Sequence, residues 1–252
     1  MQKHMKHVPV APSGSVQIDP RYWVTAILLL VAPCALAQVS MTLTSPGAGN
    51  VMDNVYTSPY TGTVAGQTGV PIICDDFADD SYLGEAWTAT ISTVADLAAN
   101  VKWATQDAAN LQYDYDEAAW LAEQLLLPAN SNPTTLGYIS FALWDVLDPG
   151  DVAAYLGATD PHGDIASGAQ VWENLAAQQT FYAGEFGNVL VYTPDLNFPI
   201  TCGSGPCPTA PPQEFLRVTT PEAPALIIFA VDLLGLASLV AFLGRRKLRF
   251  SR

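Results

Sequence analysis

The sequence predicts an α+β domain, a small β-sheet or sandwich packed with two or three helices, followed by a C-terminal transmembrane helix. Short alternating or β-branched segments in the first half and helical periodicity in the middle predict the domain. An apolar stretch of nineteen residues near the end of the 252-residue chain predicts the membrane helix.

Strands are expected from residue 40 onward. Short strands and turns are predicted in "MTLTS" and "NVYTSPYTGTV", and the β-branched run "PIIC" predicts a buried strand that ends at Cys74. In "EAWTATISTVADL", Trp87 and Ala89 alternate with threonines, which is typical of a half-buried strand. "GNVLVYTP" predicts another strand, and "EFLRVTT" predicts a last strand or an extended spacer.

Helices are predicted in the middle of the chain. Apolar residues spaced by three and four predict a helix in "YDEAAWLAEQLLL". The next helix, in "NPTTLGYISFALWDVLDPG", is expected to start with Asn132 as its cap and Pro133 in its first position, and to end at Pro149. A third is predicted over 165–186. Its apolar face would comprise Val171, Leu175, Tyr182 and Phe186.

The N-terminus predicts export. Basic residues precede the apolar run "WVTAILLLVAPCALA", which is short for a spanning helix and ends in a small-x-small pattern. Residues 1–37 are therefore predicted to be a secretory signal peptide, with an extracytoplasmic domain over 38–200. Residues 201–220 are expected to form a Pro/Gly-rich linker or spacer with a final strand.

The charge of the body excludes some partners. Between residues 38 and 220 only Lys102 and Arg217 are basic, against twenty-one Asp and Glu, a formal charge of −19. Such a body repels nucleic acid and anionic lipid, so no nucleic-acid partner is expected.

Export also places the cysteines in an oxidising compartment. Cys202 and Cys207 flank a short Gly/Pro loop, "CGSGPC", and are predicted to form a local disulfide. Cys74 is then left as a buried thiol in an apolar strand.

The densest acidic segment is "CDDFADD", which carries Asp75, Asp76, Asp79 and Asp80. Carboxylate oxygens suit calcium, but the EF-hand spacing of Gly and closing Glu is missing. Two interpretations stay open: a solvated acidic loop, or a calcium site. No other cofactor is expected.

Catalytic motifs are absent from the sequence. His162 is the only histidine of the expected mature chain, and neither a Gly-x-Ser-x-Gly elbow nor a zinc-ligand spacing occurs. The sequence therefore predicts a protein that is not an enzyme. A secreted hydrolase acting on extracellular glycan is the alternative, since paired carboxylates can cleave glycosidic bonds. A convergent acidic pair beside an open cleft would favour the hydrolase, and a closed body would favour a structural role.

The C-terminus has three parts in a fixed order. Pro221, Glu222 and Ala223 precede the apolar helix predicted over 225–243, and a basic cluster follows it at Arg245, Arg246 and Lys247. Asp232 lies in the middle of the apolar stretch. The positive-inside rule keeps the basic cluster cytoplasmic.

Residues 221–252 resemble the PEP-CTERM sorting signal of Gram-negative bacteria, with Ala223 in place of the commoner second proline. The resemblance implies recognition by an exosortase-type membrane peptidase, cleavage near the motif, and transfer to the cell surface or to extracellular polymer. The expected function is a structural or adhesive role at the cell surface or in exopolysaccharide, after transient membrane anchoring.

The body carries a second resemblance. "IICDDFAD", "EAAWLAEQLL" and "ISFALWDVLDP" are similar in order to the thioester domains of bacterial surface adhesins, in which a strand cysteine bonds to a glutamine in a later motif. The matching residues are Cys74 and Ser140, ahead of Trp144. Because Ser140 stands where that family has glutamine, no internal thioester is expected.

Overall fold

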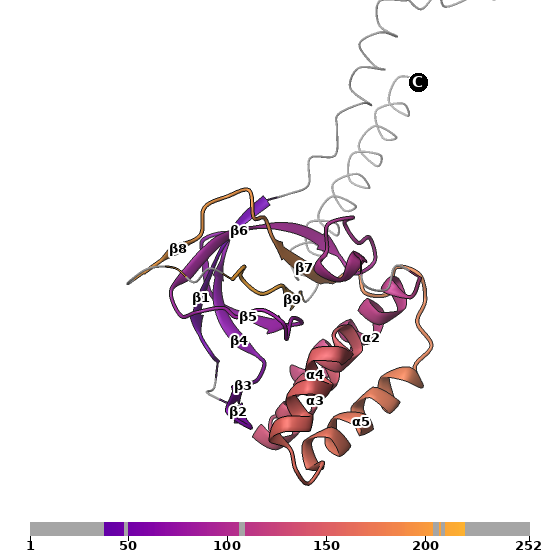
Figure 1. Ribbon diagram of the computed structural model, residues 1–252. Coiled ribbons are helices and arrows are strands. Elements are labelled where there is room, and N and C mark those ends of the chain that lie inside the picture. Colours follow the sequence, from indigo (N-terminus) through magenta and orange to yellow (C-terminus); the bar gives the residue numbers. More distant parts are fainter. Residues whose placement is uncertain (1–37, 48–49, 106–108, 204–206, 208–209, 220–252) are drawn as a thin grey trace, which may run out of the picture. The chain divides into compact units, whose positions relative to one another are not determined.

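The computed structural model describes residues 38–47, 50–105, 109–203, 207 and 210–219 (Figure 1). The chain divides into two compact units, residues 1–35 and residues 36–252, and every described residue lies in the second. The predicted signal peptide and sorting signal lie outside the described residues. Among the helices that the structure does describe, none combines the length and apolarity needed to cross a membrane.

The described part of the chain contains nine strands. They are β1 (Gln38–Ser45), β2 (Val51–Met52), β3 (Val55–Tyr56), β4 (Tyr60–Val64), β5 (Gln67–Cys74), β6 (Glu85–Thr93), β7 (Val189–Pro194), β8 (Thr201–Cys202) and β9 (Phe215–Val218). All their pairings are antiparallel. Strands β2 and β3 form a separate hairpin whose turn residues, Asp53 and Asn54, both have positive φ, as a two-residue hairpin of this twist requires.

The main sheet closes into a barrel. Its strand order is β1-β4-β5-β9-β7-β6-β8, and β1 also pairs with β6 through the register Gln38↔Thr90 to Thr42↔Ala86. Closure removes the free edges that an open sheet would expose. Strand β9, in the segment 201–220 where a final strand was expected, lies between β5 and β7, so residues 215–218 belong to the barrel wall.

Within the described residues, four α-helices pack beside the barrel. They are α2 (Leu111–Leu125), α3 (Pro133–Leu147), α4 (Pro149–Thr159) and α5 (Asp164–Ala177), with short 3₁₀ turns at η1 (Lys102–Thr105) and η2 (Pro128–Asn130). Helix α2 packs against β9, and α3 packs against α2, α4, α5 and the β2 strand. Because α3 is covered on several sides, nine of its residues are buried, as its continuously apolar sequence requires.

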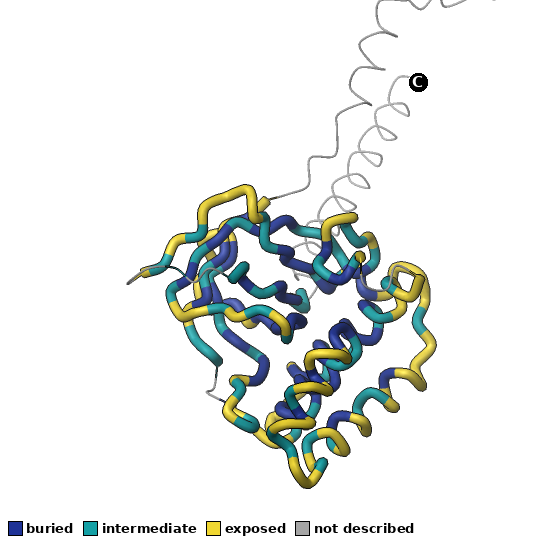
Figure 2. Tube along the Cα trace, viewed as in Figure 1, coloured by how far each residue is buried: buried dark blue, intermediate teal, exposed yellow. Residues whose placement is uncertain are grey.

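Two glycines let α3 approach its neighbours closely. A Cβ on Gly137 would lie 2.4 Å from the Met52 side chain, and one on Gly168 of α5 would lie 2.5 Å from the Tyr138 ring. Figure 2 shows that much of the barrel wall is buried, whereas α5 has long exposed stretches.

The α+β class is confirmed, with a closed barrel in place of an open sheet or sandwich and four α-helices where two or three were expected. Asn132 caps α3 as predicted, since its Oδ1 accepts from Thr134 N at 2.9 Å. The missed element is α4. Pro149, interpreted as the end of α3, occupies the first position of the next helix, and Asp148 caps it.

The third helix was predicted too long. It ends at Ala177, and its expected apolar face is partly exposed, with Val171 57% and Leu175 38% accessible. The buried residues of α5 are instead Ala169 and Ala176, because small side chains let this outer helix lie close to α3.

Candidate functional site

The acidic segment that follows β5 begins in the protein interior. Asp75 and Asp76 are fully buried, Asp79 is partly buried and Asp80 is exposed. The Oδ1 atom of Asp76 accepts from the backbone nitrogens of Ala78 and Asp79 at 3.1 Å, and its Oδ2 accepts from Glu214 N at 3.2 Å. Asp76 therefore fixes the turn that follows β5 and ties it to the start of β9.

Lys102 provides the counter-charge. Its Nζ forms one ion pair with Asp76 Oδ1 and a second with Asp79 Oδ2. The distance from Nζ to Asp79 Oδ2 is 2.7 Å. Burial alone would lower the pKa of Lys102, but the two aspartates outweigh burial and raise it. The ammonium group therefore occupies the position between the carboxylates that a metal ion would need.

A second acidic pair, Asp75 and Glu214, lies beside Asp76 and Asp79. Glu214 is buried, and its carboxylate accepts hydrogen bonds from the hydroxyls of Tyr115 and Thr193 and from Lys102 N. The oxygens of Asp75 have no donor among the described residues, and their acidic neighbour is Glu214. Burial first, and then the Glu214 charge, raise the pKa of Asp75 well above its usual range. Desolvation and the neighbouring Glu214 charge thus both favour the neutral form of Asp75.

Cys74 and Ser140, the two residues matched to the thioester motif, are linked by hydrogen bonds through Ser58. Ser58 Oγ accepts from Cys74 N at 3.0 Å, and Ser140 Oγ accepts from Ser58 N at 3.1 Å. Trp144 Nε1 donates to the carbonyl oxygen of Cys74 at 2.9 Å. Burial raises the pKa of the Cys74 thiol, which donates to the carbonyl oxygen of Asp76 at 3.0 Å. The cysteine is therefore a protonated, hydrogen-bonded core residue.

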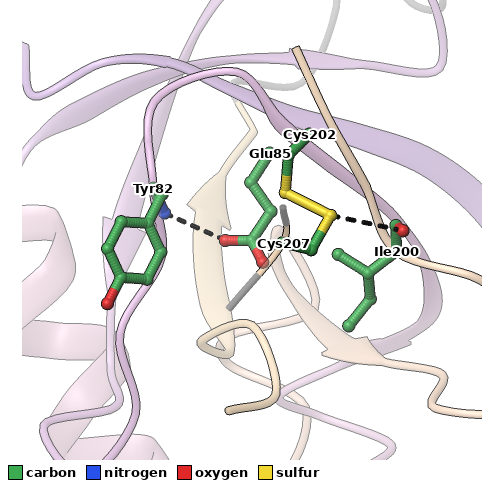
Figure 3. The surroundings of a disulfide bond; sticks show 5 residues. All are labelled: Tyr82, Glu85, Ile200, Cys202 and Cys207. Atoms are coloured by element: carbon green, nitrogen blue, oxygen red, sulfur yellow. Dashed lines mark hydrogen bonds between the residues drawn. A yellow bond between two sulfur atoms is a disulfide. The ribbon is translucent and has the colours of Figure 1, made fainter. Parts of the chain in front are cut away.

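A disulfide joins Cys202 and Cys207, whose Cα atoms are 5.4 Å apart (Figure 3). Cys207 Sγ lies 3.5 Å from the carbonyl oxygen of Ile200. Behind the bond, the buried Glu85 carboxylate accepts from Tyr82 N at 2.9 Å, and burial raises the pKa of Glu85. The disulfide thus lies where β8 pairs with the first residues of β6, and we assign it a structural role.

A third acidic pair was not anticipated from the sequence. The carboxyl groups of Glu173 of α5 and Asp145 of α3 are hydrogen-bonded to each other, and Gln170 Nε2 donates to Glu173 Oε2 at 2.7 Å. Burial, followed by the Asp145 charge, raises the pKa of Glu173 to about 7. Both carboxyl groups line a pocket of about 340 Å³ between α3, α4 and α5, here called the helical pocket. Its other lining residues are Val152, Ala153, Leu156, Gly157, Asp160, Ala166, Ala169 and Gln170.

The predicted site residues thus fall into separate places. No group of three His, Cys, Asp or Glu side chains that could hold a metal is found in the part of the chain that the structure describes. Of the four calcium candidates, Asp76 and Asp79 pair with Lys102, Asp75 neighbours Glu214, and Asp80 is exposed. The sorting-motif residues 221–223 and the basic residues 245–247 lie outside the described residues.

Sequence reasoning missed the partners of these acids. Glu214, Tyr115 and Thr193 come from three elements far apart in the chain, and no local spacing connects them with Asp75. The one available signal was Lys102, as one of two basic residues in a strongly acidic body. No protein-family model, no curated protein and no solved structure matches this chain.

Proposed function

We propose that this chain is an exported structural or adhesive protein of the cell surface or exopolysaccharide, processed by an exosortase-type peptidase. The order of its parts supports this proposal: a predicted signal peptide, an acidic body, then Pro221-Glu222-Ala223, an apolar stretch and a basic cluster. In this proposal the membrane holds the chain only until the tail is cut, and the body reaches the surface of a Gram-negative bacterium.

The structural role is supported by the internal ion pairs and hydrogen bonds of the acidic side chains. Asp76, Asp79 and Glu214 are engaged by Lys102, Tyr115, Thr193 and backbone amides, and this network joins β5, β9 and η1 in one closed body. Side chains with so many internal partners act as scaffold. The body is accordingly proposed to work without a bound metal, since Lys102 already pairs with two of the four aspartates of the calcium candidate.

The test of processing uses the full chain with an epitope after Arg252, expressed in a Gram-negative host with and without an exosortase. Mature protein at the surface should lack the epitope and end near Pro221. A Pro221→Ala, Glu222→Ala variant should stay in the membrane fraction with the epitope attached, whereas Asp80→Ala should be processed normally. Surface material whose intact mass retains "LGRRKLRFSR" would contradict the proposal.

The alternative, a hydrolase acting on extracellular glycan, is favoured by one observation. Asp145 and Glu173 converge on the helical pocket, and the pKa of Glu173, at about 7, suits a general acid. Their direct hydrogen bond weighs against it, because glycosidases keep their two carboxyl groups about 5–5.5 Å or about 6.5–9.5 Å apart to admit the sugar or a water.

Glycan hydrolysis is tested with the exported protein and its Glu173→Gln variant. Reducing ends released from neutral and acidic polysaccharides are measured between pH 5 and pH 8. The structural proposal expects no difference between the two proteins above the no-protein blank. Release by the wild type that the variant lacks would make the hydrolase the better assignment.

A further inference from the structure

We propose that a second pocket, at the start of α2, binds a hexopyranose unit of a neutral polysaccharide. This inference rests on the proposed function and names its ligand class. The pocket has a volume of about 490 Å³ and lies where α2 begins and the segment after α5 passes it; it is here called the aromatic pocket. It is lined by Ala109, Asn110, Gln112, Tyr113, Asp116, Gln179, Thr180 and Phe181.

Three aromatic rings support one wall of the aromatic pocket. Phe186 is buried, and the Phe181 ring meets it edge to face with centroids 5.5 Å apart. Tyr113 packs against Phe181 in the same manner at 6.0 Å and remains 45% exposed. The Tyr113 hydroxyl is hydrogen-bonded to Glu117, one helical turn along α2. Because the ring is held at its edge and at its hydroxyl, little conformational freedom is lost when a ligand stacks on it.

The polar side chains of this pocket are also fixed in place. Gln112 Nε2 donates to Val94 O at 2.8 Å and to Asp116 Oδ1 at 3.0 Å, and Gln179 Nε2 donates to Leu175 O at 2.8 Å. Both amide hydrogens of Gln112 and one of Gln179 are engaged, so the two glutamines offer their carbonyl oxygens, and Asp116 offers its second carboxylate oxygen. The pocket therefore combines an aromatic face with hydrogen-bond acceptors.

This combination matches the chemistry of a sugar ring. A hexopyranose has a face of C–H groups that packs on an aromatic ring and a rim of hydroxyl groups that donate to carboxylate and carbonyl oxygens. Small-molecule sites combine apolar and aromatic surface with placed polar groups. The aromatic pocket offers both, with two aromatic rings among several polar side chains. A purely aliphatic ligand would leave the Asp116 acceptor without a donor, at a cost in affinity.

Charge selects neutral polymers over acidic ones. Asp116 lies in the pocket, Glu185 and Glu117 are close to it, and the body carries a formal charge of −19 between residues 38 and 220. The two basic residues of this range, Lys102 and Arg217, are engaged with Asp76, Asp79 and Gln67. A uronate-rich chain would meet like charge without a compensating cation.

The experiment measures saturation-transfer NMR and titration calorimetry on the full-length chain in lauryldimethylamine oxide, a detergent without a sugar headgroup. The probes are cellotetraose, maltotetraose, mannotetraose and, as the acidic comparison, an alginate tetramer. At least one neutral probe should bind saturably, and the alginate tetramer should bind at least tenfold more weakly. Tyr113→Ala should weaken neutral binding about tenfold, and Tyr113→Phe, which keeps the ring, should stay within about twofold of wild type.

The matched control is Tyr56→Ala, which removes a similarly exposed tyrosine from the β2–β3 hairpin and should leave binding unchanged. Three outcomes would overturn the inference: no neutral probe binds, alginate binds as well as the neutral probes, or Tyr113→Ala binds like wild type. The proposed function is judged separately, because tail removal and surface localisation are measured without any sugar ligand.

Discussion

Two carboxyl pairs with similar chemistry lie in different surroundings. Asp75 and Glu214 are wholly enclosed between the barrel and α2, whereas Asp145 and Glu173 lie half-buried beside the helical pocket. In both pairs burial is the largest cause of the raised pKa values, and the neighbouring carboxylate adds to it for Asp75 and Glu173. The difference is in their partners: Glu214 receives two hydroxyl donors and one backbone donor, while Glu173 receives a single amide donor.

This difference assigns the pairs different roles. A buried carboxylate with a full set of donors is a structural element, because losing it leaves several donors unpaired at once. A half-buried pair with few donors exchanges its proton with solvent near neutral pH. Burial alone therefore does not separate Glu214 from Glu173; the number of donors that each carboxyl group receives does.

The largest expected effect is at the enclosed pair. Glu214→Ala removes the acceptor of the Tyr115 and Thr193 hydroxyls and of Lys102 N. We expect a loss of about 3–5 kcal/mol in the free energy of unfolding, measured by urea denaturation. Asp80→Ala, which removes an exposed acid of the neighbouring segment, should change stability by less than about 0.5 kcal/mol. A loss below about 1 kcal/mol for Glu214→Ala would show that the network does not hold the barrel together.

The next effect concerns the internal cation. Lys102→Met keeps the aliphatic stem beside Trp103 but leaves Asp76 and Asp79 without a counter-charge. Because Lys102 is partly exposed, we expect a loss of about 2 kcal/mol, less than for a wholly buried ion pair. Adding Asp76→Asn to the Lys102→Met protein should recover part of that loss in a double-mutant cycle. The comparison is Arg217→Met, which removes the other basic residue and should be nearly neutral; equal losses for both would exclude a specific role for Lys102.

Local patterns predicted much of the secondary structure, and long-range contacts explain what they missed. β-branched alternation identified β5 and β6, and the Asn132-Pro133 start identified α3. Barrel closure depends on β1 pairing with β6 and on β9 lying between β5 and β7. Neither pairing can be predicted from the sequence pattern of a single segment. The same holds for the sites: the acids after Cys74 stand out by composition, but Glu214 and the Asp145–Glu173 pair come together only in the fold.

The half-buried pair predicts a smaller, pH-dependent effect. The folded-state pKa of Glu173, at about 7, exceeds its unfolded value near 4.5. Between these values the folded protein binds more protons than the unfolded chain, so stability is full below about pH 4.5 and is lost as pH rises through about 7. After allowance for solvent screening of a half-exposed group, the loss is about 1–2 kcal/mol.

The measurement is the urea midpoint at pH 5 and at pH 7.5, for wild type and for Glu173→Gln. Repulsion among the many acids lowers stability in the same direction, and the variant separates the two causes because it retains that repulsion. Glu173→Gln should therefore show the smaller decline with pH. Identical declines would mean that Glu173 titrates in the folded state much as it does in the unfolded chain.

The smallest expected effect is the absence of a mass change at Cys74. A thioester needs the carboxamide carbon of a glutamine, and the residue joined to Cys74 through Ser58 is Ser140, whose hydroxyl supplies no acyl carbon. The thiol is buried and donates to a backbone carbonyl, so it stays in its protonated, unreactive form. The intact mass of the exported protein should equal the mass of its processed sequence less the two hydrogens lost in one disulfide, and methylamine should add nothing. A mass lower by one ammonia, restored with methylamine added at a glutamine, would show that another residue serves as the acyl partner of Cys74.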